Sequence, residues 1–248
     1  MSDRGDRADK VLVALGHFDS RASAQAAIAA GGVSVNGRVL RKASETIAAG
    51  AHIVAEPAHP WVSRGGVKLA HALDLFKVDP VGRDCLDIGA STGGFSEVLL
   101  ARGAAHVVAV DVGHGQISAK LAGEKRLISL EGRDARTLTQ ADLPTPPQLV
   151  VCDASFISLQ KLLGVPLSLA ADGAALITLF KPQFEVGKAY VGKGGIVRDE
   201  QAAKHAEDRF CDWLTDQGWA VHQRADSPIR GGDGNAERLI WAIGKNDR

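Results

Sequence analysis

The stretch that decides the fold is CLDIGASTGGF, residues 85–95. Its apolar start predicts a strand from Asp84 to Gly89, and the residues from Gly94 to Arg102 predict a helix, so a glycine-rich turn joins strand to helix. Backbone N–H groups at such a helix start face a ligand, and glycine lets that ligand come close. The next predicted strand, His106 to Asp111, ends in a carboxylate 18 residues after Gly93, at the usual place of a ribose-binding acid. The segment therefore predicts a nucleoside site at one edge of a sheet.

Three nucleoside ligands compete for this turn. A dinucleotide needs glycine where Ser91 stands, because a side chain there would crowd the pyrophosphate. A nucleoside triphosphate needs Gly-Lys-Ser/Thr at the end of the loop, which is absent. S-adenosylmethionine has no phosphate, tolerates Ser91 and Thr92, and is favoured. The candidate cofactor-binding residues are Asp87, Gly89, Ala90, Ser91, Thr92, Gly93, Gly94, Phe95 and Asp111.

The same turn also matches the nucleophile elbow of a hydrolase. Residues 89–93 read Gly-x-Ser-x-Gly between strand and helix, and Asp153 and His222 follow Ser91 in the order that a triad requires. In that fold, however, several strands and a loop that supplies half of the oxyanion hole precede the elbow. Here the elbow follows the first strand of its domain, so the hydrolase interpretation is disfavoured.

Strands and helices alternate through the rest of this region. Further strands are expected at residues 127–130, 149–153 and 174–180, helices at 159–170 and 199–218, and closing strands at 219–225 and 237–243. Strands flanked by helices predict a mainly parallel sheet covered on both faces. Because a short Gly-rich link joins the last two strands, they are expected to form an antiparallel hairpin.

The chain divides near residue 58. Helices are expected at residues 7–17 and 21–30, a hairpin at 33–40 around Asn36-Gly37, and a short strand at 52–54. Two helices with a few short strands predict a small α+β domain. The expected division is a first domain at residues 1–58, a linker at 59–63 and an α/β domain at 64–248.

Composition narrows the function classes. The chain has 248 residues with 29 basic and 29 acidic side chains, so any nucleic-acid surface has to be a local patch. Three scattered cysteines indicate a reducing compartment and argue against a disulfide framework or a zinc site. A polar N-terminus and the absence of a long apolar run predict a soluble, cytoplasmic protein without a membrane partner.

A basic cluster stands in the first domain. Between residues 7 and 42 there are six basic side chains and two acids, a net charge of +4. Such a cluster is typical of a surface that binds a phosphate backbone, and a solvated helix face remains the alternative. The loop at residues 192–199, GKGGIVRD, is either a second phosphate contact or a mobile connection.

Two adjacent strands of the α/β domain end in an ionisable residue. Asp153 follows the strand at residues 149–153, and Lys181 follows the strand at 174–180. Both are expected at the carboxyl edge of the sheet, where ligands of open α/β sheets bind. One lysine in this position is usually a solvated rim charge, so a shared site and two rim charges are the alternatives here.

The chain resembles two known families over nearly its whole length. Residues 7–9, 20–25 and 32–37 look like the S4-like RNA-binding module. The motifs WVSRGGVKL (61–69), LDIGASTGGF (86–95) and KPQFE (181–185), with residues 192–199 and SPI…GNAE (227–237), resemble the TlyA family of FtsJ-like ribose methyltransferases, also called haemolysins. The resemblance implies a Rossmann-like class I methyltransferase sheet behind an S4-like domain.

The resemblance also implies a reaction. The catalytic Lys-Asp-Lys-Glu tetrad of the family falls on Lys68, Asp153, Lys181 and Glu237. The implied activity is 2′-O-methylation of cytidines in ribosomal RNA with S-adenosylmethionine, without a metal, and the implied partner is a ribosomal subunit. The expected RNA-binding residues are Arg7, Lys10, Ser20, Arg21, Gln25, Asn36, Arg38, Arg41, Lys42, Arg64, Lys188 and Lys193.

Two other function classes are considered. A membrane-active cytolysin, as the historical family name suggests, would need a spanning segment or a strongly amphipathic basic helix, and neither is evident. A non-catalytic ribosome-assembly factor would keep the RNA-binding module beside a degenerate transferase fold. Competent residues at all four tetrad positions argue against it.

Overall fold

The computed structural model describes residues 5–245, which form two compact units, residues 5–60 and 61–245. The outermost parts of the two predicted domains, residues 1–4 and 246–248, lie outside the described residues. Along the chain, the boundary between the units follows Pro60, within the predicted linker at 59–63, and each unit is described by itself below.

The N-terminal unit contains two helices and five short strands. Helices α1 (Ala8–Ala14) and α2 (Arg21–Ala29) pack on each other. Strand β2 (Val33–Val35) pairs with β3 (Arg38–Val39) and with β5 (Ile53–Ala55), and β1 (Asp6–Arg7) pairs with β4 (Thr46–Ile47). Both helices and the expected strand at 52–54 are thus present in outline. The pairing of β1 with β4 is not predicted, because two-residue strands carry no periodic signal.

Local sequence explains the main turns of this unit. Ser20 caps α2, since its hydroxyl accepts from the backbone N–H of Ser23, and the Ser23 hydroxyl accepts from the backbone N–H of Ser20. Asn36 and Gly37 both have positive φ, 49° and 79°, as a tight hairpin turn between right-twisted strands requires. Buried apolar residues from both helices and the strands form one small core, with Leu12, Ile28 and Leu40 among them.

The C-terminal unit is built on a seven-stranded sheet. Its strand order is β11-β12-β10-β9-β6-β7-β8. The parallel strands are β6 (Asp84–Ile88), β7 (His106–Asp111), β8 (Leu127–Glu131), β9 (Leu149–Cys152) and β10 (Ala175–Phe180). Strand β12 (Arg238–Gly244) is antiparallel to both β10 and β11 (Trp219–Asp226), which confirms the predicted hairpin.

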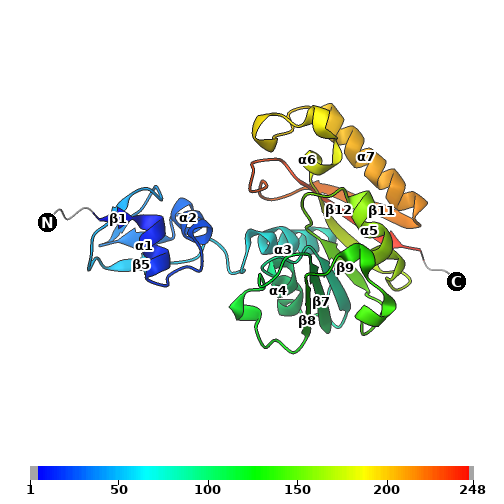
Figure 1. The fold of residues 1–248 in the computed structure, drawn as a ribbon, viewed down its shortest axis with the longest axis horizontal. Helices are drawn as coiled ribbons and strands as arrows, with labels where there is room; N and C mark the ends of the chain where they lie inside the picture. Colours follow the sequence, from blue (N-terminus) through cyan, green and yellow to red (C-terminus); the bar gives the residue numbers. More distant parts are fainter. Residues whose placement is uncertain (1–4, 246–248) are drawn as a thin grey trace. The chain divides into compact units, whose positions relative to one another are not determined.

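Helices cover both faces of this sheet (Figure 1). Helices α3 (Arg64–Phe76) and α4 (Gly94–Ala101) share one apolar core with one face. Helices α5 (Leu159–Ser168) and α7 (Glu200–Asp216) share a second core with the other face. The α/β class is therefore confirmed, with a doubly covered and mostly parallel sheet.

Two helices are not anticipated from the sequence. Helix α3 carries Leu69, Ala72, Leu73 and Phe76 on one buried face. Their spacing is helical, but the sequence prediction did not include this helix. Helix α6 (Pro182–Glu185) is a single turn begun by Pro182, directly after β10. Five 3-10 turns, η1 (Ala119–Leu121), η2 (Ala135–Thr137), η3 (Gln140–Asp142), η4 (Lys188–Tyr190) and η5 (Lys193–Gly195), complete the described elements.

The strand order places a crevice at the middle of the sheet. Strand β6 lies between β7 and β9, so the chain leaves β6 towards one side first and returns to its other side later. Loops after β6 and β9 therefore separate at their carboxyl ends, which is where open α/β sheets bind ligands. The glycine turn after β6 and Asp153 after β9 both lie at this point.

Candidate functional site

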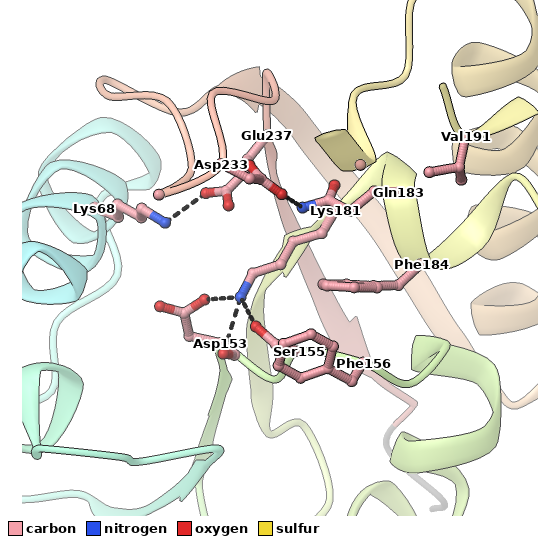
Figure 2. Close-up of a pocket in the computed structure, with 12 residues that line it drawn as sticks. Lys68, Asp153, Ser155, Phe156, Lys181, Gln183, Phe184, Val191, Asp233 and Glu237 are labelled. Carbon is pink, nitrogen blue, oxygen red and sulfur yellow. Dashed lines mark hydrogen bonds and ion pairs between the residues drawn. The ribbon is translucent and has the colours of Figure 1, made fainter. Parts of the chain in front are cut away.

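The four tetrad positions converge on one cavity. Lys68 comes from α3, Asp153 follows β9, Lys181 follows β10, and Glu237 precedes β12. All four line a cavity of about 430 Å³ at the carboxyl edge of the sheet (Figure 2). The structure thus brings together residues that are up to 169 positions apart in the chain.

Two ion pairs organise this cavity. Lys68 Nζ donates to Glu237 Oε2 at 2.5 Å, and Lys181 Nζ lies 2.6 Å from Asp153 Oδ1. Lys68, Lys181 and Glu237 are only 6%, 7% and 4% exposed. Charged side chains are rarely buried this far unless they are paired, because desolvation is costly. Two such pairs facing one cavity make a chemical site the better explanation than two solvated rim charges.

Ser155 completes the surroundings of Lys181. The Lys181 ammonium donates to Ser155 Oγ at 2.9 Å and to the Asp153 carbonyl oxygen at 3.1 Å, besides its contact with the Asp153 carboxylate. An ammonium has three N–H donors, and these two hydrogen bonds use two of them, while the Asp153 carboxylate pairs with the positive charge. Sequence reasoning missed Ser155, because one serine in a loop after a strand carries no pattern.

The glycine turn after β6 is shaped by two left-handed glycines and by Asp111. Gly89 and Gly93 have φ of 78° and 89°, and a Cβ on Gly89 would stand 2.9 Å from Ala154 Cα. Asp111 Oδ2 accepts from the Ser91 N–H at 2.8 Å, and Asp111 Oδ1 accepts from the Gly113 N–H at 2.7 Å. Asp111 therefore braces the turn from the end of the neighbouring strand.

Asp87 lies underneath the turn. It is fully buried, and Ser96 Oγ donates to its Oδ2 at 2.7 Å. Burial raises the pKa of the Asp87 carboxyl to about 7, although the hydrogen bond from Ser96 opposes the shift. Asp87 lines none of the three cavities described in this section, so its geometry is that of a support below the ligand surface.

Two further cavities adjoin the turn. One of about 590 Å³ is lined by Asp111, Val112, Ala135 and Leu162, and one of about 210 Å³ is lined by residues 89–92 with Gly94 and Phe95. Asp153 and Ser155 line both of them and also the cavity of the tetrad. All predicted cofactor residues of the turn except Gly93 line at least one of these two cavities.

Several predicted RNA-binding residues of the N-terminal unit hold partners within that unit. Asp9 is fully buried and accepts from Arg7, Arg21 and Gln25, which holds the pKa of its carboxyl well below its usual range. Arg38 pairs with Glu45 at 2.9 Å. These contacts give the basic cluster a structural role in addition to any contact with RNA.

The other predicted RNA contacts divide into two groups. Ser20 caps α2, and Asn36 Oδ1 accepts from the His52 N–H at 2.9 Å. Arg64 donates to the Arg230 carbonyl oxygen. Among the predicted RNA-binding residues, those that are exposed and form no ion pair or side-chain hydrogen bond within residues 5–245 are Lys10, Arg41 and Lys42 in the first unit and Lys188 and Lys193 in the second.

The hydrolase arrangement is absent. Ser91 lies after β6, whereas His222 lies on β11, four strands away in the sheet order. At about 4.8 Å per strand this separation is roughly 19 Å. The His222 ring instead packs on Trp241, with ring centroids 4.9 Å apart.

None of the helices between residues 5 and 245 is both long and apolar enough to span a bilayer. The same residues contain no group of three or more His, Cys, Asp or Glu side chains arranged to hold a metal ion. Burial raises the pKa of the Cys85 and Cys152 thiols to about 12, so neither is a reactive thiolate.

Comparison with known proteins identifies both units. Residues 61–243 match the FtsJ-like methyltransferase family, and residues 6–53 match the S4 domain. The chain is 41% identical over 247 residues to the 16S/23S rRNA (cytidine-2′-O)-methyltransferase TlyA of Mycobacterium tuberculosis, which covers 99% of this chain and 92% of that protein. The chain belongs to the TlyA family of FtsJ-like methyltransferases.

Solved structures agree with this assignment. A hemolysin-named protein of Streptococcus thermophilus is 35% identical, has a TM-score of 0.77, and covers 99% of this chain and 92% of its own. An S-adenosylmethionine dependent methyltransferase of Mesorhizobium loti is 13% identical with a TM-score of 0.53, and covers 70% of this chain and 96% of its own. That second likeness shows the fold alone. The predicted TlyA resemblance, with an S4 region before a class I methyltransferase sheet, is confirmed.

Proposed function

We propose that this TlyA-family chain transfers the methyl group of S-adenosylmethionine to the 2′-hydroxyl of cytidines in ribosomal RNA. The observation that carries the proposal is the convergence of the Lys68–Glu237 and Lys181–Asp153 pairs on one cavity beside the glycine turn. The relative from M. tuberculosis is named for this reaction on 16S and 23S ribosomal RNA. The S4 domain supplies an RNA-binding unit on the same chain.

The residues of the turn fit S-adenosylmethionine. The close approach of Gly89 to Ala154 leaves no room for a side chain, and the two adjoining cavities provide separate space for a nucleoside and an amino-acid tail. In our proposal the cavity with Asp111 and Leu162 holds the adenosine, and the cavity with Ser91 and Thr92 holds the methionine part. When bound, the cofactor supplies an electrophilic methyl group on a sulfonium.

The tetrad then acts on the ribose hydroxyl. Asp153 lines the two cofactor cavities and the tetrad cavity, so it stands where methyl and hydroxyl have to meet. Two hydrogen bonds and the ion pair with Asp153 fix the Lys181 ammonium at the cavity, where its positive charge stabilises negative charge developing on the 2′-oxygen. Lys68, held by Glu237, places a second positive charge on the same cavity. Because the sulfonium is already reactive, the protein has to position the hydroxyl, stabilise its developing charge and take up its proton, for which the Asp153 carboxylate is the acceptor in our proposal.

Replacement of Lys181 tests the proposal. Lys181→Ala should lower the rate of methyl transfer by about 10²–10⁴-fold, because it removes the positive charge at the reacting oxygen. S-adenosylmethionine affinity should stay nearly unchanged. Ribosomal subunits from cells that lack this gene serve as substrate, mass spectrometry of nuclease digests locates the ribose methyl groups, and calorimetry measures cofactor binding.

A matched control distinguishes the loss of Lys181 from the loss of a lysine charge elsewhere in the protein. Lys161 is an exposed lysine of α5 that lines none of the three cavities, so Lys161→Ala should retain full activity. Full turnover by Lys181→Ala would refute its assigned role. Absence of any ribose methylation by the wild-type protein on either subunit would refute the proposed function.

A further inference from the structure

The tetrad cavity has an aromatic part in its wall. Phe156 and Phe184 both line it, with ring centroids 5.2 Å apart and planes tilted by 52°. Phe156 is 91% exposed and has a positive φ of 67°, an unusual conformation for a bulky residue. The exposed ring of Phe156, beside the half-buried ring of Phe184, suits an unstacked nucleobase, because every base offers a π face.

A polar part of the same wall is formed by Asp233 and Gln183. Gln183 Nε2 donates to Asp233 Oδ2 at 2.9 Å (Figure 2). The Asn235 N–H donates to Asp233 Oδ1 at 3.0 Å. A carboxylate accepts about four hydrogen bonds, so Asp233, which is exposed, keeps acceptor capacity towards the cavity. Partial burial opposes ionisation of Asp233, but these hydrogen bonds outweigh it and lower the pKa of its carboxyl.

Asp233 also fixes the orientation of the Gln183 amide. An ionised carboxylate has only acceptors, so the NH₂ group of Gln183 has to face it and the amide oxygen has to point elsewhere. Gln183 Oε1 is buried and has no hydrogen-bond partner among residues 5–245. A buried acceptor without a donor is costly, and a donor supplied by a ligand would relieve that cost.

The polar wall lies close to the reacting groups. A Cβ on Gly231 would stand 2.7 Å from Glu237 Oε1 and 2.9 Å from Asp233 Oδ1, so the two carboxylates are near neighbours. Glu237 in turn holds Lys68. A nucleotide whose ribose reaches the tetrad therefore brings its base within the range of Asp233.

We propose that Asp233, held in place by Gln183, selects the target base by accepting a hydrogen bond from the N4 amino group of cytosine. This inference rests on the proposed function and adds the basis of its specificity. Cytosine presents a donor at this edge, whereas uracil presents the O4 acceptor, which an ionised carboxylate repels. Acidic side chains that accept from cytosine N4 are a common form of base reading.

The test compares cytidine with uridine at one position. Ribosomal subunits are prepared from cells that lack the gene, with either base at a nucleotide that the wild-type protein methylates, and kcat/KM is measured on each. The wild-type protein should prefer cytidine by about 10- to 100-fold, the discrimination expected of one good base contact. Asp233→Ala should reduce this preference to about threefold or less, mainly by slowing methylation of cytidine.

Asp233→Asn provides a sharper outcome. Its amide oxygen can replace the acceptor for Gln183 or the acceptor for the Asn235 N–H but not both, and its NH₂ group is a donor where the wild type has only acceptors, so methylation of uridine should rise relative to that of cytidine. A residue with a merely structural role would slow both substrates equally. Asp212→Ala, at an exposed position of α7 outside the cavity, is the matched control and should keep the wild-type preference.

The possible results are distinguishable. A wild-type protein that methylates neither base overturns the proposed function itself. A wild-type protein that methylates both bases equally overturns the inference about Asp233 and leaves the methyltransferase assignment standing. The same holds if both Asp233 variants fold, as circular dichroism would show, and keep the wild-type preference.

Discussion

The basic residues of the N-terminal unit differ in whether they are paired, which their positions in the chain do not indicate. Counting charges predicts a net +4 cluster in the N-terminal unit, yet Arg7 and Arg21 both hold the buried Asp9. The count is correct, but it cannot tell a paired guanidinium from a free one, because the pairing depends on how α1 and α2 pack. Lys10, Arg41 and Lys42 are exposed side chains of this cluster that form no ion pair, and we propose that they contact RNA.

Glu185 is a second residue whose role depends on its surroundings. It ends α6, and its Oε1 accepts from the backbone N–H of Leu159 at the start of α5, 2.8 Å away. It therefore ties the segment after Lys181 to the helix that follows Asp153, Ser155 and Phe156. Burial raises the pKa of the Glu185 carboxyl to about 7, although the bond from Leu159 opposes the shift.

This raised pKa predicts a pH-dependent gain of stability in Glu185→Gln. Ionisation of Glu185 costs the native state free energy, so its contribution to stability is lost as pH rises from about 4.5 through 7. Glutamine keeps the acceptor for Leu159 and does not ionise. Thermal unfolding should show little difference between variant and wild type at pH 4.5, and a gain on the order of 2–3 kcal/mol at pH 8. Equal unfolding temperatures of the two proteins at pH 8 would contradict the prediction. Glu200→Gln, at an exposed position, is the control and should show no such pH-dependent gain.

Among the elements, α3 has the largest consequence for the site. It carries Lys68 into the tetrad cavity, and its apolar face packs in the core beneath β6 and β10. Trp61 packs so closely on its first turn that a Cβ on Gly66 would stand 2.5 Å from Trp61 Cβ. Glycine at this position lets the segment from Trp61 to Ser63 lie against the helix.

Two glycine-to-alanine variants test this contact. Gly66→Ala should destabilise the C-terminal unit by about 1–3 kcal/mol, because the added methyl group displaces Trp61. Gly164→Ala in α5 should stabilise the protein by about 0.5–1 kcal/mol, since its Cβ would meet no other group and alanine favours helix. Urea unfolding measures both changes, and a stabilising Gly66→Ala would show that Trp61 does not limit the space at this helix.

On the scale of the whole molecule, the chain supplies an S4 unit and a transferase unit with separate cores. Within the transferase unit, the cavities assigned to adenosine, methionine and acceptor nucleotide share Asp153 and Ser155. This arrangement follows from strand order, since β6 and β9 are neighbours and both end at the same edge.

Removal of one basic side chain from the S4 unit should weaken binding of ribosomal subunits without affecting the chemistry. Lys42→Ala should lower affinity and reduce the slope of log K against log salt concentration by about one unit, if Lys42 contacts one phosphate. Methyl transfer at saturating substrate should stay unchanged. The affinity for ribosomal subunits, measured at several salt concentrations from about 50 to 200 mM, gives this slope for the variant and the wild type. An unaltered slope, equal to that of Lys204→Ala on α7, would remove Lys42 from the RNA contact surface.

The sequence predicts much of the fold and half of the site. Local sequence patterns predict the glycine turn, the strand ends at Asp153 and Lys181, and the final hairpin. These patterns are the spacing of apolar residues and the positions of Gly and Pro, and neither depends on tertiary structure. Lys68 and Glu237 follow only from the family resemblance, because a lysine within a helix and a glutamate before a strand have no distinctive pattern. Helix α3 is missed although its apolar spacing is regular.

What the amino-acid sequence determined by itself was the alternation of strands and helices, the family and, through the family, the four candidate tetrad residues. Tertiary structure alone decided which charges are paired: Lys68 with Glu237, Lys181 with Asp153 and Ser155, and Arg21 with Asp9. It also placed Asp233 and Gln183 on the wall of the acceptor cavity. The physical reason is that hydrogen bonds and ion pairs act over about 3–4 Å, and the separation of two residues in space does not follow from their separation in the chain.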